Sequence, residues 1–166
     1  MHWNERLGPR NRPRVGLAWS GNPMHSNDRN RSLKLRALAP LLDLDALFVS
    51  LQREVRADDA ALLKDPTNII HFGEELRNFA DTAALISNLD LVISVDTSVA
   101  HLAGALSKPV WVLLPFIPDW RWLLDRDDSP WYPSARLFRQ DESRAWEDVV
   151  ARVHRALREF IQIQQQ

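Results

Sequence analysis

The stretch that most constrains the fold is LVISVDTSVAHLAGAL, residues 91–106. Residues 91–95 form an almost unbroken apolar run rich in β-branched side chains, which is typical of a central parallel strand buried on both faces. After Asp96, positions 99, 102, 103 and 106 form one helical stripe. Lys108 and Pro109 end the helix. The stretch therefore predicts a strand, a sharp turn and a packed helix.

The turn carries side chains suited to an anion. Thr97 and Ser98 are favourable N-cap residues, so free backbone N–H groups, hydroxyls and the positive end of a helix dipole meet at the carboxyl edge of the sheet. Such an arrangement can seat a phosphate. His101 lies on the face of Ser98 and leans toward the helix start, so it either reaches a phosphate oxygen or caps a carbonyl in the core. Asp96 binds a ligand hydroxyl, hydrogen-bonds turn amides, or does both.

The rest of the chain alternates strands with helices. Further strands are predicted at 14–19, 47–51, 68–72, 110–114 and 135–138. Helices are predicted at 35–42, where Pro40 either lies in the first turn or breaks the helix, at 57–63, at 82–89 with Asp81 as the cap, and at 144–162. This pattern predicts an α/β fold, a doubly wound Rossmann-like parallel sheet of six strands in the order 3-2-1-4-5-6.

The chain has the size of one domain. At 166 residues and 45% hydrophobic composition it can bury a single core without cross-links. We expect this domain to span residues 14–162. The polar segment 1–13, which contains Gly8, Pro9 and Pro13, is expected to be a linker, and residues 163–166 a frayed tail.

Composition also argues against several classes of function. A formal net charge of −1 gives no reason to expect nucleic acid or an anionic membrane as a partner. No apolar run has the length of a signal peptide or a membrane span. The histidines lack metal-ligand spacing, so no metal is expected. The absence of cysteine fits a reducing compartment, so we expect a soluble cytoplasmic protein.

A long polar loop, residues 20–32, follows the first strand. In the predicted strand order this loop faces the turn at 96–101 across the crevice where such sheets bind ligands. Arg29 and Arg31 are candidates to clamp a phosphate, and Asn22 and Asn27 offer amides to sugar or phosphate oxygens. The alternative is a solvated surface loop.

Motifs narrow the chemistry of this crevice. No Gly-x-Gly-x-x-Gly or Gly-x-x-x-x-Gly-Lys-Ser/Thr motif is present, which disfavours nicotinamide, flavin and ATPase functions. Ser98, His101 and Asp96 are not set in a Gly-x-Ser-x-Gly elbow, which disfavours a hydrolase. A helix terminus with hydroxyls, a histidine and two loop arginines remain. This set suits a diphosphate.

Four stretches carry a resemblance to known proteins. Residues 92–106, VISVDTSVAHLAGAL, resemble the Asp-Thr-Gly-x-x-His segment of the heptosyltransferase family, in the nucleotide-diphospho-sugar domain of GT-B glycosyltransferases. Residues 19–32, 79–86 and 119–133 resemble the C-terminal domain of bacterial tetratricopeptide-repeat proteins related to those enzymes and, more distantly, to O-GlcNAc transferases. The resemblance covers nearly all of residues 14–160.

The resemblance implies roles for individual residues. Asp96, Thr97 and Ser98 would meet the donor's diphosphate and sugar, with His101 in support, and Arg31 takes the place of the family's loop lysine. Residues 73–79 would lie along the base and ribose. Ser98 stands where heptosyltransferases have glycine, which narrows the space beside the donor and disfavours a heptose. The candidate donor-binding residues are Asn22, His25, Asn27, Arg29, Arg31, Gln52, Leu76, Asp96, Thr97, Ser98 and His101.

The resemblance also implies a function. It makes the chain a single GT-B half-domain that binds the nucleotide-diphospho-sugar donor of a glycosyltransferase acting on a hydroxyl acceptor. No catalytic residue is expected, because the acceptor site and general base belong to an N-terminal domain or repeat array outside these residues. No cofactor or metal is expected either, since the helix dipole and cations take the leaving charge. The alternative is a non-catalytic nucleotide or nucleotide-sugar binding module of a repeat-containing protein. Base, sugar, acceptor and oligomeric state stay open.

Overall fold

The computed structural model describes residues 3–64 and 69–165, and in it six parallel strands form one sheet. The order is β3-β2-β1-β4-β5-β6, so the predicted α/β fold and strand order are confirmed. The strands are β1 (Arg14–Ala18), β2 (Leu47–Ser50), β3 (Ile69–His71), β4 (Leu91–Val95), β5 (Val110–Leu114) and β6 (Ala135–Arg139). Asn68, the first residue of the predicted third strand, and Gln166, the last of the predicted tail, lie outside the described residues.

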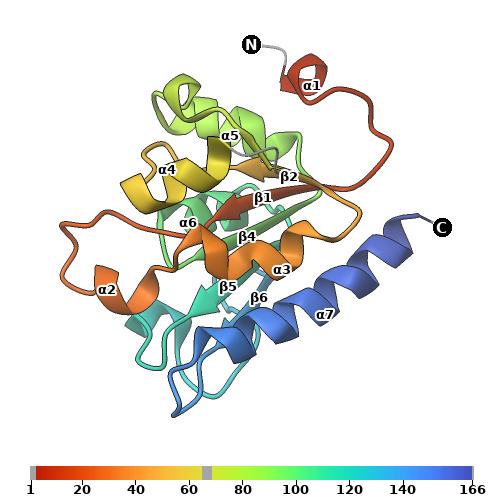
Figure 1. Cartoon of the computed structure of the whole chain (residues 1–166). Coiled ribbons are helices and arrows are strands. Elements are labelled where there is room, and N and C mark those ends of the chain that lie inside the picture. Colours follow the sequence, from red (N-terminus) through yellow and green to blue (C-terminus); the bar gives the residue numbers. More distant parts are fainter. Residues whose placement is uncertain (1–2, 65–68, 166) are drawn as a thin grey trace.

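Helices cover both faces of this sheet (Figure 1). The α-helices are α1 (Trp3–Arg6), α2 (Asp28–Arg31), α3 (Ala39–Leu42), α4 (Ala57–Lys64), α5 (Phe79–Ser87), α6 (Ser98–Ala105) and α7 (Trp146–Gln164). Three 3₁₀ turns are η1 (Leu35–Leu38), η2 (Gly73–Glu75) and η3 (Trp120–Trp122). Each face has its own apolar core: α3 and α7 pack in one, α1, α5 and α6 in the other. The buried stripe of α7 runs through Val149, Val153 and Leu157, as its helical spacing predicts.

The central strand and its helix form as the sequence indicates. All five residues of β4 are buried. Ala100 and Ala103 of α6 are fully buried, so small side chains let the helix lie close to the sheet. Gly104 has no side chain where it faces Tyr132: a Cβ at this position would lie 2.5 Å from Cγ of Tyr132. The glycine therefore admits an aromatic ring from residues 119–133.

Residues 1–2 of the expected linker lie outside the described residues, and Trp3, Leu7 and Gly8 of the same segment contact the domain. Trp3 of α1 is buried, with its ring centroid 5.1 Å from that of Phe72. The buried Arg14 guanidinium donates to Oδ1 of Asn4 over 2.8 Å and to the carbonyl of Gly8 over 2.7 Å. Leu7, four positions after Trp3, is buried in the same core, but two apolar residues in a polar segment are too short a pattern to predict a packed helix.

Helix α5 begins earlier than expected. Asn78, not Asp81, is its N-cap: Oδ1 of Asn78 accepts from the Asp81 amide over 3.0 Å. The Asp81 carboxylate turns back and accepts from the Arg77 amide over 3.1 Å. Asp81 thus lies in the first turn, where a carboxylate favours the helix dipole.

Among the described residues, no helix is both long and apolar enough to cross a membrane.

Candidate functional site

The two ends of the polar loop after β1, residues 20–32, are joined by hydrogen bonds, and Arg56 binds both ends from outside the loop. The Gly21 amide donates to Oγ of Ser32 over 2.9 Å, and that hydroxyl donates to Oδ1 of Asp28 over 2.7 Å. Nη2 of Arg56 lies 2.5 Å from Oδ2 of Asp28 and 3.3 Å from the Gly21 carbonyl. Asp28 is buried and is the first residue of α2. These bonds therefore hold the two ends of the loop, while residues 22–26 between them are exposed, so this part of the loop is solvated.

Two buried polar side chains fix the point where the loop leaves the sheet. Oε1 of Gln52 accepts from the amides of Trp19 and Ser20 over 3.0 and 3.1 Å. Asp59 accepts from Nε1 of Trp19 and from the Leu35 amide, each over 2.9 Å. Gln52, a predicted donor-binding residue, thus has its carbonyl oxygen engaged by the backbone. In this arrangement it shapes the start of the loop.

Arg31 joins the loop to the turn after β4. Its Nη1 donates to the backbone carbonyl of Asp96 over 2.7 Å. Its Nε is buried and has no hydrogen-bond partner among the described residues. The guanidinium fits there because residue 21 is glycine: a Cβ at Gly21 would lie 2.7 Å from Nη2 of Arg31. The two segments that the strand order predicted to face each other are in direct contact.

The N-terminus of α6 lies at this contact. Its N-cap, Thr97, has extended backbone angles (φ −142°, ψ 174°), and its side chain makes no capping bond. Oγ1 of Thr97 instead lies 3.3 Å from Oγ of Ser94. The N–H groups that begin a helix have no partner within it. The Ala100 amide donates to the Thr97 carbonyl over 3.1 Å, whereas the amides of Ser98 and Val99 have no capping side chain in the described part of the chain. These two donors are open to an anion.

His101 is held by aromatic side chains. Its ring stacks on that of Trp122, with centroids 5.1 Å apart and planes at 21°. Nδ1 lies 3.0 Å from Oη of Tyr132, and Nε2 lies 3.9 Å from Oδ1 of Asp96. Burial lowers the pKa of His101 below its ordinary 6.5, while the Asp96 charge opposes that shift. The partner of the imidazole is a phenol rather than the core carbonyl considered as the alternative.

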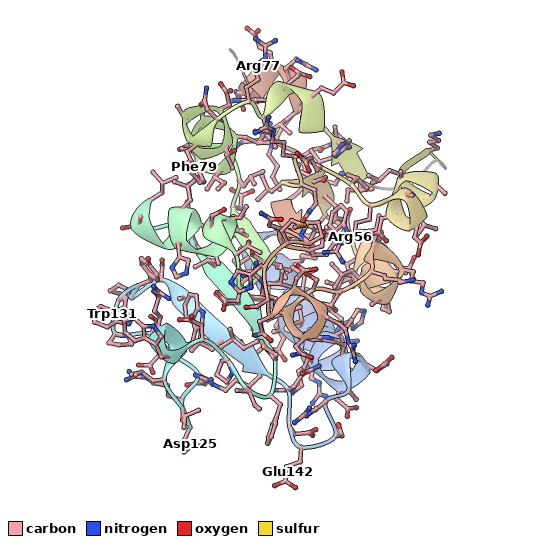
Figure 2. The ribbon with its side chains drawn as sticks, turned by 90° about the vertical axis from the view of Figure 1, so that its left-hand side faces the viewer. Arg56, Arg77, Phe79, Asp125, Trp131 and Glu142 are labelled. Carbon is pink, nitrogen blue, oxygen red and sulfur yellow. The ribbon has the colours of Figure 1, made fainter. Side chains whose placement is uncertain are left out.

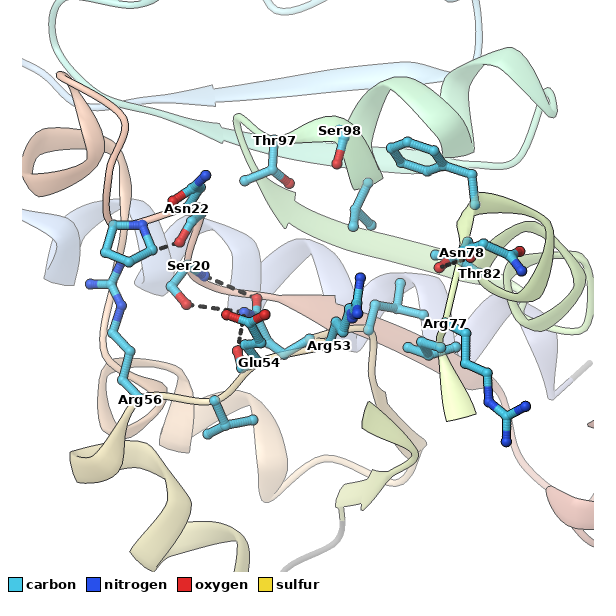
Figure 3. Close-up of a pocket in the computed structure, with 18 of the residues that line it drawn as sticks. Ser20, Asn22, Arg53, Glu54, Arg56, Arg77, Asn78, Thr82, Thr97 and Ser98 are labelled. Carbon is cyan, nitrogen blue, oxygen red and sulfur yellow. Dashed lines mark hydrogen bonds between the residues drawn. The ribbon is translucent and has the colours of Figure 1, made fainter. Parts of the chain in front are cut away.

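A first cavity of about 810 Å³ opens beside this turn, within the range of small-molecule sites. Its wall comes from the ends of four strands: Ser20–Pro23 and Arg31, Leu51–Arg56, Leu76–Phe79 with Thr82, and Thr97–Val99. Figure 3 shows Thr97 and Ser98 across the cavity from Arg53 and Glu54. Figure 2 labels two residues of this wall: Arg56, from the segment after β2, and Phe79, from the segment after β3.

A second cavity of about 510 Å³ also reaches the start of α6. It is lined by His25, Asn27, Asn30, Arg31, Asp96, Thr97, Ser98, His101, Ile117, Pro118, Asp119 and Arg121. Three residues line both cavities: Arg31, Thr97 and Ser98. A ligand that spans the two cavities would therefore pass over the open end of α6.

The structure gathers most of the predicted site residues. Asn22, Gln52 and Leu76 line the first cavity, His25, Asn27, Asp96 and His101 the second, and Arg31, Thr97 and Ser98 both. Arg29 is the exception, because it is exposed and lines neither of these cavities. Among the described residues, no group of three or more His, Cys, Asp or Glu side chains could hold a metal ion.

Sequence reasoning missed several residues of the site. The first cavity also contains Arg53, Glu54 and Arg56, and the second contains Asp119. A usable signal exists for the first three: they directly follow β2, and ligands of open α/β sheets bind beyond the carboxyl ends of the strands. Asp119 comes after the end of β5 and follows from the same rule.

Two comparisons with known proteins bear on this site. Residues 76–114 match the family model of glycosyltransferase family 9 (heptosyltransferase), a stretch that includes α5, β4, α6 and β5. Protein FlbA of Caulobacter vibrioides is 31% identical over 167 residues, which cover 96% of this chain and 27% of FlbA. The chain thus spans about a quarter of the length of this curated relative.

Proposed function

We propose that this chain is the donor-binding half-domain of a GT-B glycosyltransferase and binds a nucleotide-diphospho-sugar. The observation that carries the proposal is the junction of the two cavities at Arg31, Thr97 and Ser98. A nucleotide-sugar has two uncharged arms joined by a dianionic centre. A guanidinium and the open end of a helix suit that centre, and a cavity on either side suits the arms. The family match over residues 76–114 supports the same assignment.

The linings suggest how the donor lies. The first cavity contains the apolar side chains of Leu51, Val55 and Leu76, which suit the face of a base, together with the polar Glu54 and Asn78. The second is lined mainly by polar side chains, including Asn27, Asp96 and Asp119, which suit sugar hydroxyls. We therefore place the nucleoside in the first cavity, the diphosphate at the junction and the sugar in the second.

In this proposal the chain binds the donor without completing the reaction. A transferase needs a general base beside the acceptor hydroxyl. That base and the acceptor site are assigned to another part of a longer protein, either an N-terminal domain or a tetratricopeptide-repeat array. The coverage of only 27% of FlbA supports such an arrangement. Arg31 and the α6 dipole would stabilise the leaving diphosphate in place of a metal.

Calorimetry tests the binding step. UDP, ADP and GDP should be titrated separately, each beside its unphosphorylated nucleoside. We expect one diphosphate to bind clearly more tightly than its nucleoside. At about 100 times its dissociation constant, that ligand should raise the free energy of unfolding by about 2.7 kcal/mol. If none of the three binds or raises the melting temperature at millimolar concentration, the proposal is wrong.

A non-catalytic nucleotide-binding module is the second candidate. The observation that favours it is that all the residues assigned to the donor in this proposal belong to this chain, so the proposed binding needs no further domain. Both candidates predict no sugar transfer by this chain alone. The two candidates predict different results for a longer protein that contains this chain. If that protein consumes the donor when a hydroxyl acceptor is present, the result supports the transferase. If it binds the donor tightly without consuming it, the result supports the module.

A further inference from the structure

Residues 119–133, which the proposed function leaves largely unused, enclose His101. Trp131 is 58% exposed and lies at the surface in Figure 2. The next residue, Tyr132, turns inward: its ring packs over Gly104 of α6, and its Oη lies 3.0 Å from Nδ1 of His101. Trp122, which is buried, stacks on the imidazole, and its ring also contacts that of Tyr132, with centroids 6.3 Å apart. Aromatic contacts thus fix the ring plane, and one hydrogen bond engages Nδ1.

The surroundings of His101 select one tautomer. A neutral imidazole carries one N–H and one lone pair, and the hydrogen bond at one nitrogen decides the other. Oδ1 of Asp96 lies 3.9 Å from Nε2. A lone pair on Nε2 would face this carboxylate unfavourably, whereas an Nε2–H group would be attracted to it. The Nε2–H tautomer leaves a lone pair on Nδ1, which accepts the Tyr132 hydroxyl hydrogen.

The Nε2–H group remains available to a ligand. A separation of 3.9 Å is too long for a hydrogen bond to Asp96. Both His101 and Asp96 line the second cavity, beside the three residues shared with the first. An oxygen atom of a ligand placed there can accept from Nε2 without displacing a hydrogen-bond partner from the described part of the chain.

We propose that Tyr132 is a positioning residue that holds His101 as an Nε2–H donor toward the diphosphate or sugar oxygens of the donor. The inference rests on the proposed function for the identity of the ligand. The tautomer itself is a property of the free protein. Failure of the two ideas can therefore be told apart.

Nitrogen-15 NMR of the imidazoles tests the tautomer without any ligand. In the wild-type chain near neutral pH, we expect the Nδ1 shift of His101 to be that of an unprotonated nitrogen and the Nε2 shift that of a protonated one. Tyr132→Phe keeps the ring over Gly104 and removes only the hydroxyl, so the two shifts should move toward each other as the tautomers mix. Trp131→Phe is the matched control. It removes an indole that donates to the Arg121 carbonyl and should leave the His101 shifts unchanged.

Titration with UDP, ADP and GDP tests the consequence. Tyr132→Phe should weaken binding of the diphosphate that the wild type prefers by about 3- to 10-fold, the range of one ordinary hydrogen bond. The same substitution in a His101→Asn background should have almost no effect, because Tyr132 acts through His101. A protonated Nδ1 in the wild type, or an equal loss in both backgrounds, would overturn the inference. Absence of binding by the wild type would instead count against the proposed function and, with it, the ligand assigned to Nε2.

Discussion

The guanidinium of Arg31 donates to the backbone carbonyl of Asp96 over 2.7 Å and so joins α2 to the end of β4. The bond uses Nη1 and leaves Nη2 beside Gly21 at the junction of the two cavities. One side chain thereby has two tasks: it holds the loop in place and brings a positive charge to the start of α6.

Arg31→Ala should lose both functions. We expect nucleoside diphosphate binding to weaken about tenfold or more, since a charge-assisted contact in a partly closed site contributes about 1.5–3 kcal/mol. Free-protein stability should fall by about 1 kcal/mol with the bond to Asp96. Arg29→Ala is the control, because Arg29 is exposed and lines neither cavity. Calorimetry measures the affinity of both variants for the nucleoside diphosphate. Equal affinities for Arg31→Ala and the wild type would show that Arg31 does not bind the diphosphate.

Arg56 should stabilise the loop through Asp28. The ion pair is 2.5 Å long, and the Asp28 side chain is only 9% exposed whereas that of Arg56 is 40% exposed. Arg56→Ala leaves a nearly buried carboxylate without its cation, so we expect a loss of about 1–3 kcal/mol in the free energy of unfolding. Adding Asp28→Asn should recover part of this loss, because the unpaired charge is gone. Urea unfolding of the single and double variants measures the coupling, and strictly additive losses would contradict it.

Stability should fall in mildly acidic solution because of two histidines. Burial lowers the pKa of both His71 and His101 below 6.5; Glu74 opposes the shift at His71, and Asp96 and Asp119 oppose it at His101, where Arg121 adds to it. As pH falls through 6.5, the unfolded chain takes up protons before the folded chain does. The free energy of unfolding should therefore decrease below about pH 7 and level off once the folded-state pKa values are passed.

Urea unfolding at several pH values, beside NMR titration of both imidazoles, checks this dependence. His71→Gln should reduce the slope between about pH 7 and 5, a window above that in which exposed carboxylates titrate. A slope unchanged by this substitution would exclude His71 as a source.

The sheet could be predicted because its determinants are local. The β4 run is apolar on both faces, and right-handed crossovers then restrict the strand order. The rule that ligands lie beyond the carboxyl ends of strands also predicts that the loop with Arg31 faces the turn at Asp96.

Other features depend on contacts between distant positions and leave no periodic trace. Trp3 packs on Phe72 from a segment that reads as a linker. The Arg56–Asp28 pair and the Tyr132–His101 pair join residues 28 and 31 positions apart. Arg29 and Arg31 look equivalent in the sequence, but in the folded chain Arg29 is exposed whereas Arg31 lines both cavities.

Gly104→Ala should reverse the usual effect of this substitution in a helix. Replacing a helix-interior glycine by alanine ordinarily stabilises by about 0.5–1 kcal/mol. Here the new Cβ would lie 2.5 Å from Cγ of Tyr132, so the ring must move. We expect a net loss of about 1–3 kcal/mol from overpacking, measured by urea unfolding. In a Tyr132→Ala background the obstacle is absent, and Gly104→Ala should become neutral or stabilising. A stabilising effect in the wild-type background would show that Tyr132 does not occupy this position over α6.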